Sequence, residues 1–188
     1  MRARRTLLKK AAALGLGTAT LSLLTGLAHA QPKYTISAQQ LQAVVAERFP
    51  LRYPVGGLLS LAMQAPALRL LPATNRLGAD MQIEASGPAL GRPYAGSADV
   101  DFALRYEASD KTIRAYRLKV NALRMQGLPP EASMLLSAYG GALVEQALLE
   151  VVVHTLRPQD LQLAETMGLK PGDITVTDQG VVVNFVMG

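Results

Sequence analysis

Cysteine is absent from this sequence of 188 residues, and its absence removes several kinds of chemistry. The chain has no disulfide and no thiol nucleophile, and it has no cysteine to which a lipid could be attached. A folded domain must then be stabilised by its hydrophobic core alone. Residues 31–188 are numerous enough to bury such a core without cross-links.

Histidine is nearly absent too, because only His29 and His154 occur. We expect His154 near the end of a helix, where an imidazolium interacts favourably with the helix dipole. The alternative, a catalytic triad, lacks a nucleophile-elbow sequence. Without cysteine or a spaced carboxylate cluster, no metal site is expected. The glycine pairs at 56–57 and 140–141 lack the spacing of a phosphate-binding loop. We therefore expect no catalytic residue, no metal, no cofactor and no enzymatic activity.

Net charge is also missing once the first thirty residues are set aside. The whole chain carries a formal net charge of +5, and all five excess basic residues lie within residues 1–10. From Gln31 onward, fourteen basic residues balance fourteen acidic ones. No basic stripe with interleaved aromatic residues remains, so nucleic acid is not expected as a partner.

Residues 1–30 have the three parts of a cleavable signal peptide. A basic segment, MRARRTLLKK, precedes an apolar stretch, and Ala28-His29-Ala30 forms an A-x-A cleavage site. The apolar stretch is short for a bilayer span and is interrupted by glycines, although a retained N-terminal anchor is the alternative. We expect cleavage after Ala30 and release of one domain, residues 31–188, into the periplasm, with no integral membrane span.

The pair Arg4-Arg5 leaves the export route open. RRTLLKK is similar to the twin-arginine signal, which exports proteins that have already folded. An ordinary basic segment that happens to contain two arginines would serve the general secretory route equally well.

Alternating polarity in the middle of the chain predicts antiparallel strands. Residues 76–86 are the clearest case, with an apolar face made of Leu77, Ala79, Met81, Ile83 and Ala85. Residues 58–71 predict a weaker strand, with Pro66 at an edge or a bulge. Residues 72–75 predict a tight connection between the two strands.

Residues 99–120 predict a long hairpin whose turn is centred on Ser109. Opposed residues then have numbers that sum to 218, and opposite charges face one another on one side of the hairpin. Asp99 and Asp101 become partners of basic residues rather than a catalytic pair of carboxylates. The predicted pairs are Asp101–Arg117, Asp99–Lys119, Glu107–Lys111, Phe102–Tyr116 and Val100–Leu118.

The other segments predict helices and a final hairpin. Residues 37–49 predict a short helix capped by Ser37, and residues 51–57 a loop. Residues 130–156 are apolar on almost every side, which predicts a long core helix bent at its glycine pair. Residues 158–168 predict a second short helix, and residues 173–188 the last hairpin. The expected fold is α+β, with a long, highly twisted antiparallel sheet wrapped around the long apolar helix.

The predicted helix and sheet carry many apolar side chains, which leaves two alternatives for the core. The core is either closed and dry, or partly open and able to hold an acyl chain, as apolar pockets do. For the open core, the residues expected to line the ligand site are Met81, Ile83, Phe102, Leu104, Tyr116, Leu118, Leu136, Tyr139, Leu143 and Ala147.

The order and spacing of several segments resemble the YceB-like family of bacterial envelope lipoproteins, a domain of unknown function. These segments are YTISAQQLQ (34–42), the hairpin AGSADVDFALRYEASDKTIRAYRLKV (95–120), the long helix, and MGLKPGDITV (167–176). The resemblance implies the fold of the tubular lipid-binding (TULIP) superfamily, in which a twisted sheet wraps a helix and the seam can hold lipid. Many members are anchored through a cysteine. Because this chain has none, anchoring is not implied, and the family supplies no catalytic residues.

These observations favour a soluble periplasmic protein that binds or carries a lipid or fatty-acyl ligand. The alternative is a closed-core interaction module of the cell envelope, which would bind an envelope protein and no ligand.

Overall fold

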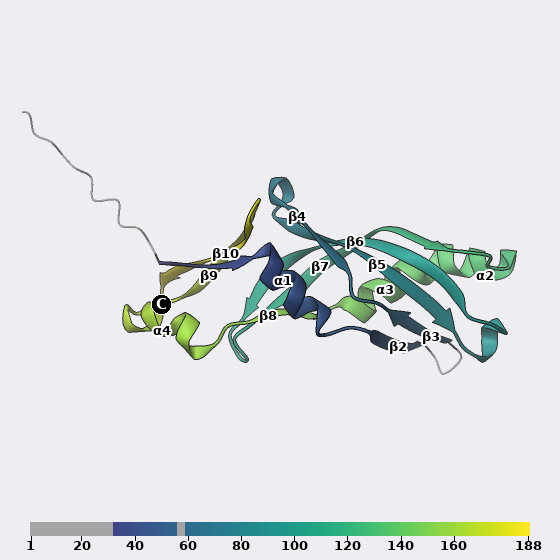
Figure 1. The fold of residues 1–188 in the computed structure, drawn as a ribbon, viewed down its shortest axis with the longest axis horizontal. Coiled ribbons are helices and arrows are strands. Elements are labelled where there is room, and N and C mark those ends of the chain that lie inside the picture. The colour runs from purple at the N-terminus through teal and green to yellow at the C-terminus, as the bar shows by residue number, and fades with distance from the viewer. Residues whose placement is uncertain (1–31, 56–58) are drawn as a thin grey trace, which may run out of the picture. The chain divides into compact units, whose positions relative to one another are not determined.

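The computed structural model describes residues 32–55 and 59–188, which form two antiparallel sheets and several short helices (Figure 1). The elements follow one another as β1 (Lys33–Ser37), α1 (Ala38–Ala46), β2 (Leu51–Val55), β3 (Leu59–Met63), β4 (Ala67–Leu71), η1 (Pro72–Thr74), β5 (Arg76–Ser86), η2 (Pro88–Leu90), β6 (Tyr94–Glu107), β7 (Thr112–Met125), α2 (Pro130–Leu135), η3 (Leu136–Gly140), α3 (Gly141–Leu148), β8 (Val152–Thr155), α4 (Pro158–Thr166), β9 (Leu169–Thr177) and β10 (Gly180–Met187).

The larger sheet has the strand order β2-β3-β5-β6-β7-β8, with β4 pairing a separate part of β5. Strands β6 and β7 are 14 residues long, and the sheet curls strongly into a half-barrel (Figure 1). The predicted α+β class is confirmed in this coarser form, a mixed fold dominated by a curled antiparallel sheet. The apolar face of β5 is also confirmed, because Leu77, Ala79, Met81, Ile83 and Ala85 are all buried.

A long apolar helix wrapped by the sheet is not what the structure contains, and the prediction of one helix over 130–156 was wrong. The helical run covers residues 130–148 and consists of α2, the π-helical turn η3 and α3. Glu150 then adopts a positive φ of 63°, and the next residues form β8, which pairs with β7. The β-branched residues 151–153 favour a strand over a helix. The π-helical turn η3 ends at Gly140, the first residue of the glycine pair where a bend was expected.

The predicted hairpin register was also wrong. The loop contains the four residues 108–111, so Glu107 pairs with Thr112. The numbers of paired residues next to the loop therefore sum to 219 rather than to the predicted 218. Two irregularities further along β7 shift the register again, to Asp101–Lys119 and then to Asp99–Ala122. At the first of these, Arg117 has a φ of 48°. Bulges of this kind insert unpaired residues into one strand, so none of the five predicted pairs forms.

Two segments before β5 also differ from the prediction. Residues 51–55 form the edge strand β2 rather than a loop, and Pro54 is tolerated there because an edge strand has unpaired amide positions. Residues 58–71 are not one strand. Among the described residues they form β3 and β4, which separate at residues 64–66 and pair with different parts of β5.

The smaller sheet has the order β1-β10-β9 and joins the two ends of the described chain. Its β9–β10 hairpin confirms the predicted final hairpin, and α4 confirms the helix predicted over 158–168. Helix α1 confirms the helix predicted over 37–49, and Ser37 caps it by accepting a hydrogen bond from the Gln40 amide (3.2 Å). On the same helix, Gln42 donates to the Pro66 carbonyl (2.8 Å) and accepts from the Leu68 amide (2.9 Å) along β4.

The predicted signal peptide, residues 1–30, lies outside the described residues and stays a prediction. Within the described part of the chain, none of the helices is both long enough and apolar enough to cross a membrane.

Candidate ligand-binding site

A pocket of about 480 Å³ lies between the helical run of residues 130–148 and the sheet strands β3, β5 and β7. This volume falls within the range of about 300–1,000 Å³ that is typical of small-molecule sites. The pocket is partly open to solvent. It is lined by Leu61, Ile83, Ala85, Leu90, Leu123, Met125, Leu128, Pro129, Glu131, Ala132, Leu136, Tyr139, Gly140, Leu143 and Val144.

The way the helical run meets the sheet explains the hollow. Helix α3 packs firmly on the sheet, because Val144 is 1% exposed and Glu145 accepts a hydrogen bond from the Val120 amide of β7 (3.3 Å). At Gly140 the approach is so close that an added Cβ would lie 2.7 Å from the side chain of Leu123. Towards α2 the residues become exposed, and Tyr139 is 63% exposed. The helical run therefore packs against the sheet more closely at α3 and Gly140 than at α2.

The lining is apolar except for two groups. The carboxylate of Glu131 and the hydroxyl of Tyr139 are the polar side-chain groups among the lining residues, and both residues are exposed. Leu61, Ile83 and Val144 also line the pocket, and all three are buried. Glu131 and Val144 are thirteen residues apart, so the helical segment that borders the pocket is about 20 Å long at about 1.5 Å per residue. The pocket is therefore apolar except at the exposed residues Glu131 and Tyr139.

The residues predicted to line a ligand site separate into three groups. Ile83, Leu136, Tyr139 and Leu143 come together in this pocket. Met81, Phe102 and Leu118 line a second hollow of about 30 Å³, which is only water-sized. Leu104, Tyr116 and Ala147 line neither of these hollows.

Sequence reasoning missed the lining residues of β7 and of the short connections. Leu123 and Met125 alternate with polar Arg124, but out of phase with Leu118 and Val120 because the register of β7 shifts between Val120 and Ala122, so simple alternation did not reveal them. Leu90, Leu128 and Pro129 lie in short connections, and no periodicity marks such residues.

His154 lies on strand β8 and not at a helix end, so that prediction was wrong. The hydroxyl of Tyr34 is 3.5 Å from its Nε2, and its Nδ1 is buried without a partner among the described residues. Burial lowers the pKa of His154, and it does so against the opposing effect of the Asp160 carboxylate. An uncharged, half-buried imidazole beside a tyrosine acts here as a packing group between β1 and β8.

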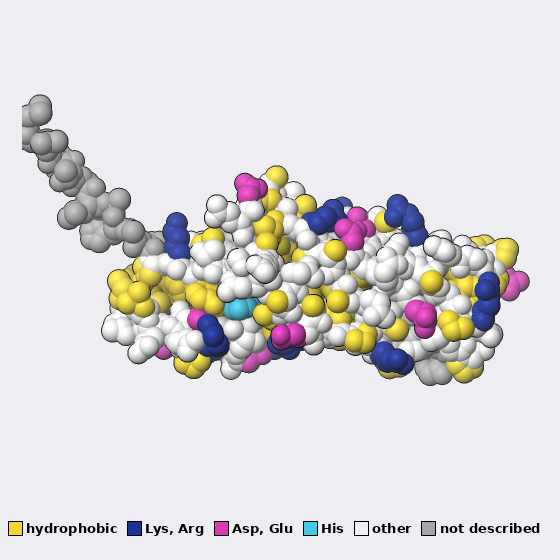
Figure 2. All heavy atoms as spheres, in the orientation of Figure 1, with side chains coloured by type: hydrophobic (Ala, Val, Ile, Leu, Met, Phe, Trp, Pro, Cys, Tyr) yellow, Lys and Arg dark blue, Asp and Glu magenta, His cyan; other side chains and the backbone are white. Residues whose placement is uncertain are grey.

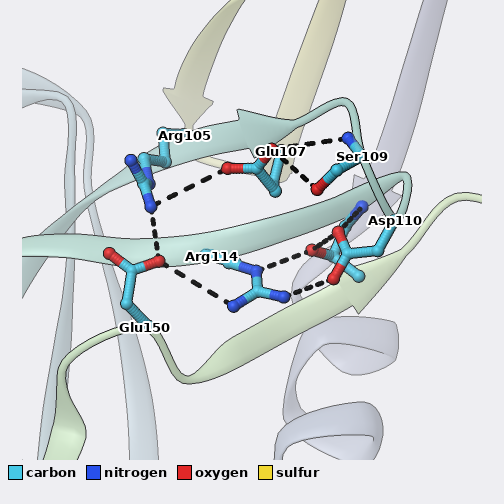
Figure 3. A network of polar contacts seen from close by, with 7 residues as sticks. Arg105, Glu107, Ser109, Asp110, Arg114 and Glu150 are labelled. Atoms are coloured by element: carbon cyan, nitrogen blue, oxygen red, sulfur yellow. Dashed lines mark hydrogen bonds and ion pairs between the residues drawn. The ribbon is translucent and has the colours of Figure 1, made fainter.

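A polar network surrounds the β6–β7 turn and could at first suggest a chemical site (Figure 3). Glu150 accepts a hydrogen bond from Arg105 (2.5 Å), and Arg114 pairs with Asp110. Hydrogen bonds from Thr112 and Arg114 lower the pKa of Asp110. Each of these carboxylates is held by an arginine, so the network fastens the turn to the segment that follows α3.

Asp99 and Asp101 also have basic partners, although not the predicted ones. Arg69 of β4 donates to Asp99 (2.7 Å), while Arg76 of β5 pairs with Asp101. Burial favours a raised pKa at Asp101, but hydrogen bonds from Asn121 and Arg76 outweigh it and lower the pKa. The two aspartates therefore form ion pairs with arginines, as expected, but those arginines lie on β4 and β5 rather than on β7.

Charged and metal-binding side chains do not gather into a second candidate site in the described residues. In residues 32–55 and 59–188, no group of three His, Asp or Glu side chains is placed to hold a metal ion. On the face drawn in Figure 2, basic and acidic side chains are interspersed rather than gathered by sign. The apolar pocket is thus the feature of the described chain that is best suited to a ligand.

No family model matches the chain, and a search of curated proteins found no match either. The resemblance to the YceB-like family therefore stays a prediction. The fold defines the class of the protein as a mixed α+β fold dominated by a half-barrel sheet. Its apolar pocket is the feature from which a function can be inferred.

Proposed function

We propose that this protein binds or carries a lipid or other acyl-chain ligand in the pocket beneath the helical run of residues 130–148. The observation that carries the proposal is the size and polarity of the pocket, which is about 480 Å³ in volume, lined mostly by apolar side chains and partly open to solvent. Fully burying a methylene group contributes about 0.8 kcal/mol. A chain of such groups could therefore bind with few polar contacts.

The length of the helical segment beside the pocket agrees with this ligand class. The hydrocarbon core of a bilayer is about 30 Å thick, so one acyl chain spans about 15 Å. The helical segment of about 20 Å that borders the pocket is long enough to lie beside such a chain. The half-barrel sheet and the resemblance to lipid-binding folds of the TULIP type support the same proposal, as does the predicted export to the periplasm. The proposed role is binding or carriage without catalysis.

A second candidate is an interaction module that binds an envelope protein. It is favoured by exposed apolar side chains on α4 and at the end of β10, namely Leu163, Met167 and Met187. Figure 2 shows hydrophobic side chains gathered over this part of the molecule. An exposed apolar patch often marks an interaction site.

Blocking the pocket tests the first candidate. Ala132 lines the pocket, whereas Ala138 is exposed on the outer side of η3. Ala132→Phe should abolish binding of a fluorescent fatty acid, and Ala138→Phe should leave it unchanged. Circular dichroism would verify that both variants fold.

Native mass spectrometry of the purified protein is the second measurement. A co-purifying lipid that Ala132→Phe removes would support the proposal. A protein that carries no lipid and binds no fluorescent fatty acid would contradict it and favour the interaction module.

A further inference from the structure

We propose that the pocket selects a zwitterionic acyl lipid, one whose polar end carries both an anionic phosphate and a cationic amine. This inference rests on the proposed function and adds the chemistry of the head group. It is carried by two oppositely charged side chains, Glu131 in the lining of the pocket and Arg92 beside the lining residue Leu128.

The pocket orients an amphipathic ligand. Its lining is apolar apart from Glu131 and the Tyr139 hydroxyl, and buried Leu61, Ile83 and Val144 offer no group to satisfy a charge. Burying a charge without a partner is costly. The hydrocarbon part of the ligand should therefore lie against the apolar lining, with its polar end beside the exposed residue Glu131.

Arg92 lies beside another lining residue, Leu128. Its Nη2 atom is 3.4 Å from the place where a Cβ would stand on Gly127, which directly precedes the lining residue Leu128. Its guanidinium also lies over the ring of Tyr94, 4.8 Å from the centroid. The aromatic ring holds this long side chain beside the pocket rather than leaving it free in solvent.

Neither charge is neutralised within the described residues. Glu131 lines the pocket and Arg92 borders it, both are exposed, and neither forms an ion pair in the part of the chain that the structure describes. An arginine binds phosphate oxygens with paired hydrogen bonds. A carboxylate attracts an ammonium group and repels another carboxylate. The two charges together fit a phosphate–amine head group better than they fit the single carboxylate of a free fatty acid.

Competition against a bound fluorescent fatty acid tests the selectivity. The competitors are a lysophosphatidylethanolamine, a free fatty acid and an uncharged monoacylglycerol that all carry the same acyl chain. We expect the zwitterion to bind about fivefold more tightly than the fatty acid, as is reasonable for exposed charge pairs. Raising the salt concentration should reduce this difference.

Charge-removing variants locate the effect. Arg92→Gln should lower the affinity for the zwitterion about fivefold and leave the affinity for the monoacylglycerol unchanged. Glu131→Gln should raise the affinity for the fatty acid relative to that for the zwitterion. The matched controls are Lys170→Gln and Asp173→Asn, at two exposed positions on β9. Neither control should change the affinity for the zwitterion relative to that for the monoacylglycerol or the fatty acid.

The outcomes separate the two proposals. If all three competitors bind equally, or if both charge-removing variants keep the wild-type ratios, the head-group proposal is overturned while acyl binding stands. If no competitor displaces the probe because the probe itself does not bind, the proposed function fails as well.

Discussion

The side chain of Asn75 pairs with the backbone of Val176 as a neighbouring strand would. Its Oδ1 accepts a hydrogen bond from the Val176 amide (2.7 Å), and its Nδ2 donates to the carbonyl of Ile174 (3.0 Å). Asn75 follows η1 with a φ of 53°, a conformation that asparagine tolerates better than most residues. The turn between β4 and β5 is thereby attached to β9 of the smaller sheet.

Replacing Asn75 should weaken the attachment between the two sheets. Asn75→Ala removes both hydrogen bonds and places a residue that disfavours a positive φ. We expect the free energy of unfolding to fall by about 2–3 kcal/mol, measured by urea denaturation. Asn75→Gly keeps the backbone conformation and should lose about 1 kcal/mol less. Equal losses in the two variants would show that backbone conformation contributes nothing at this position.

The adjacent glycines 140 and 141 should respond in opposite directions to alanine. At Gly140 the added methyl meets Leu123 and Leu136, whereas at Gly141 nothing lies within 4 Å. Gly140→Ala should therefore cost about 1–3 kcal/mol by overpacking and should narrow the pocket. Gly141→Ala should stabilise the helix by roughly 0.5–1 kcal/mol. Thermal unfolding measures the first effect, and acyl-probe affinity measures the narrowing. A stabilised Gly140→Ala variant would contradict the close packing.

Protonation of His154 should destabilise the fold. Burial lowers the pKa of His154 in the folded protein, so the unfolded chain takes up the proton first as the pH falls. The contribution of the neutral imidazole to the free energy of unfolding is fully present above the pKa of histidine in the unfolded chain, about 6.5. It is lost progressively as the pH falls below that value. Urea denaturation of the wild type should show this loss as the pH falls below about 6.5. A His154→Gln variant should lack this part of the pH dependence, and an unchanged profile would contradict the assignment.

Asp101 should matter more to stability than Asp80, although both pair with arginines. The Asp101–Arg76 pair is largely buried, with side chains 15% and 22% exposed, whereas the Asp80–Arg69 pair is about half exposed. Asp101→Asn should cost about 1–2 kcal/mol, and Asp80→Asn less than about 0.5 kcal/mol. Because the pKa of Asp101 is lowered in the fold, its contribution is present above about pH 4 and lost as the pH falls further. The two variants should therefore converge in acid.

Export provides a prediction that does not depend on the fold. Expressed with its leader in a bacterium, the protein should be recovered from the periplasm with Gln31 as its first residue, as measured by intact mass. Ala30→Leu changes the A-x-A site and should leave a longer chain. A periplasmic wild-type protein of full-length mass would favour the retained anchor instead.

Local patterns predicted local structure well in this chain. The alternation over residues 76–86 and the capped helix beginning after Ser37 depend on neighbouring residues and were correct. The hairpin register failed first because the loop holds four residues, which already shifts the pairing at Glu107 and Thr112, and then because two irregularities along β7, one of them with Arg117 in the left-handed region, add residues that alternation alone does not reveal. The end of the long helix failed because pairing of β8 with β7 outweighed the helical pattern of residues 149–156.

The pocket was predictable only in part for a similar reason. An apolar surplus in helix and sheet indicated that a hollow was physically reasonable, and four lining residues were found. Its location depends on how closely the helical run packs against the sheet, which is determined by the contact at Gly140 and by the anchoring of Glu145 on β7. These are tertiary distances, and sequence periodicity carries no information about them.

The side chain of Gln42 has a consequence for how copies of this protein behave in solution. Residues 31–188 have a net charge of zero, so charge repulsion does little to keep two copies apart. Exposed strand edges would then invite edge-to-edge aggregation. Gln42 occupies backbone groups of Pro66 and Leu68 on the outer edge of β4, much as Asn75 does on β9. Two amide side chains thus take the places that strands of a second copy would otherwise fill.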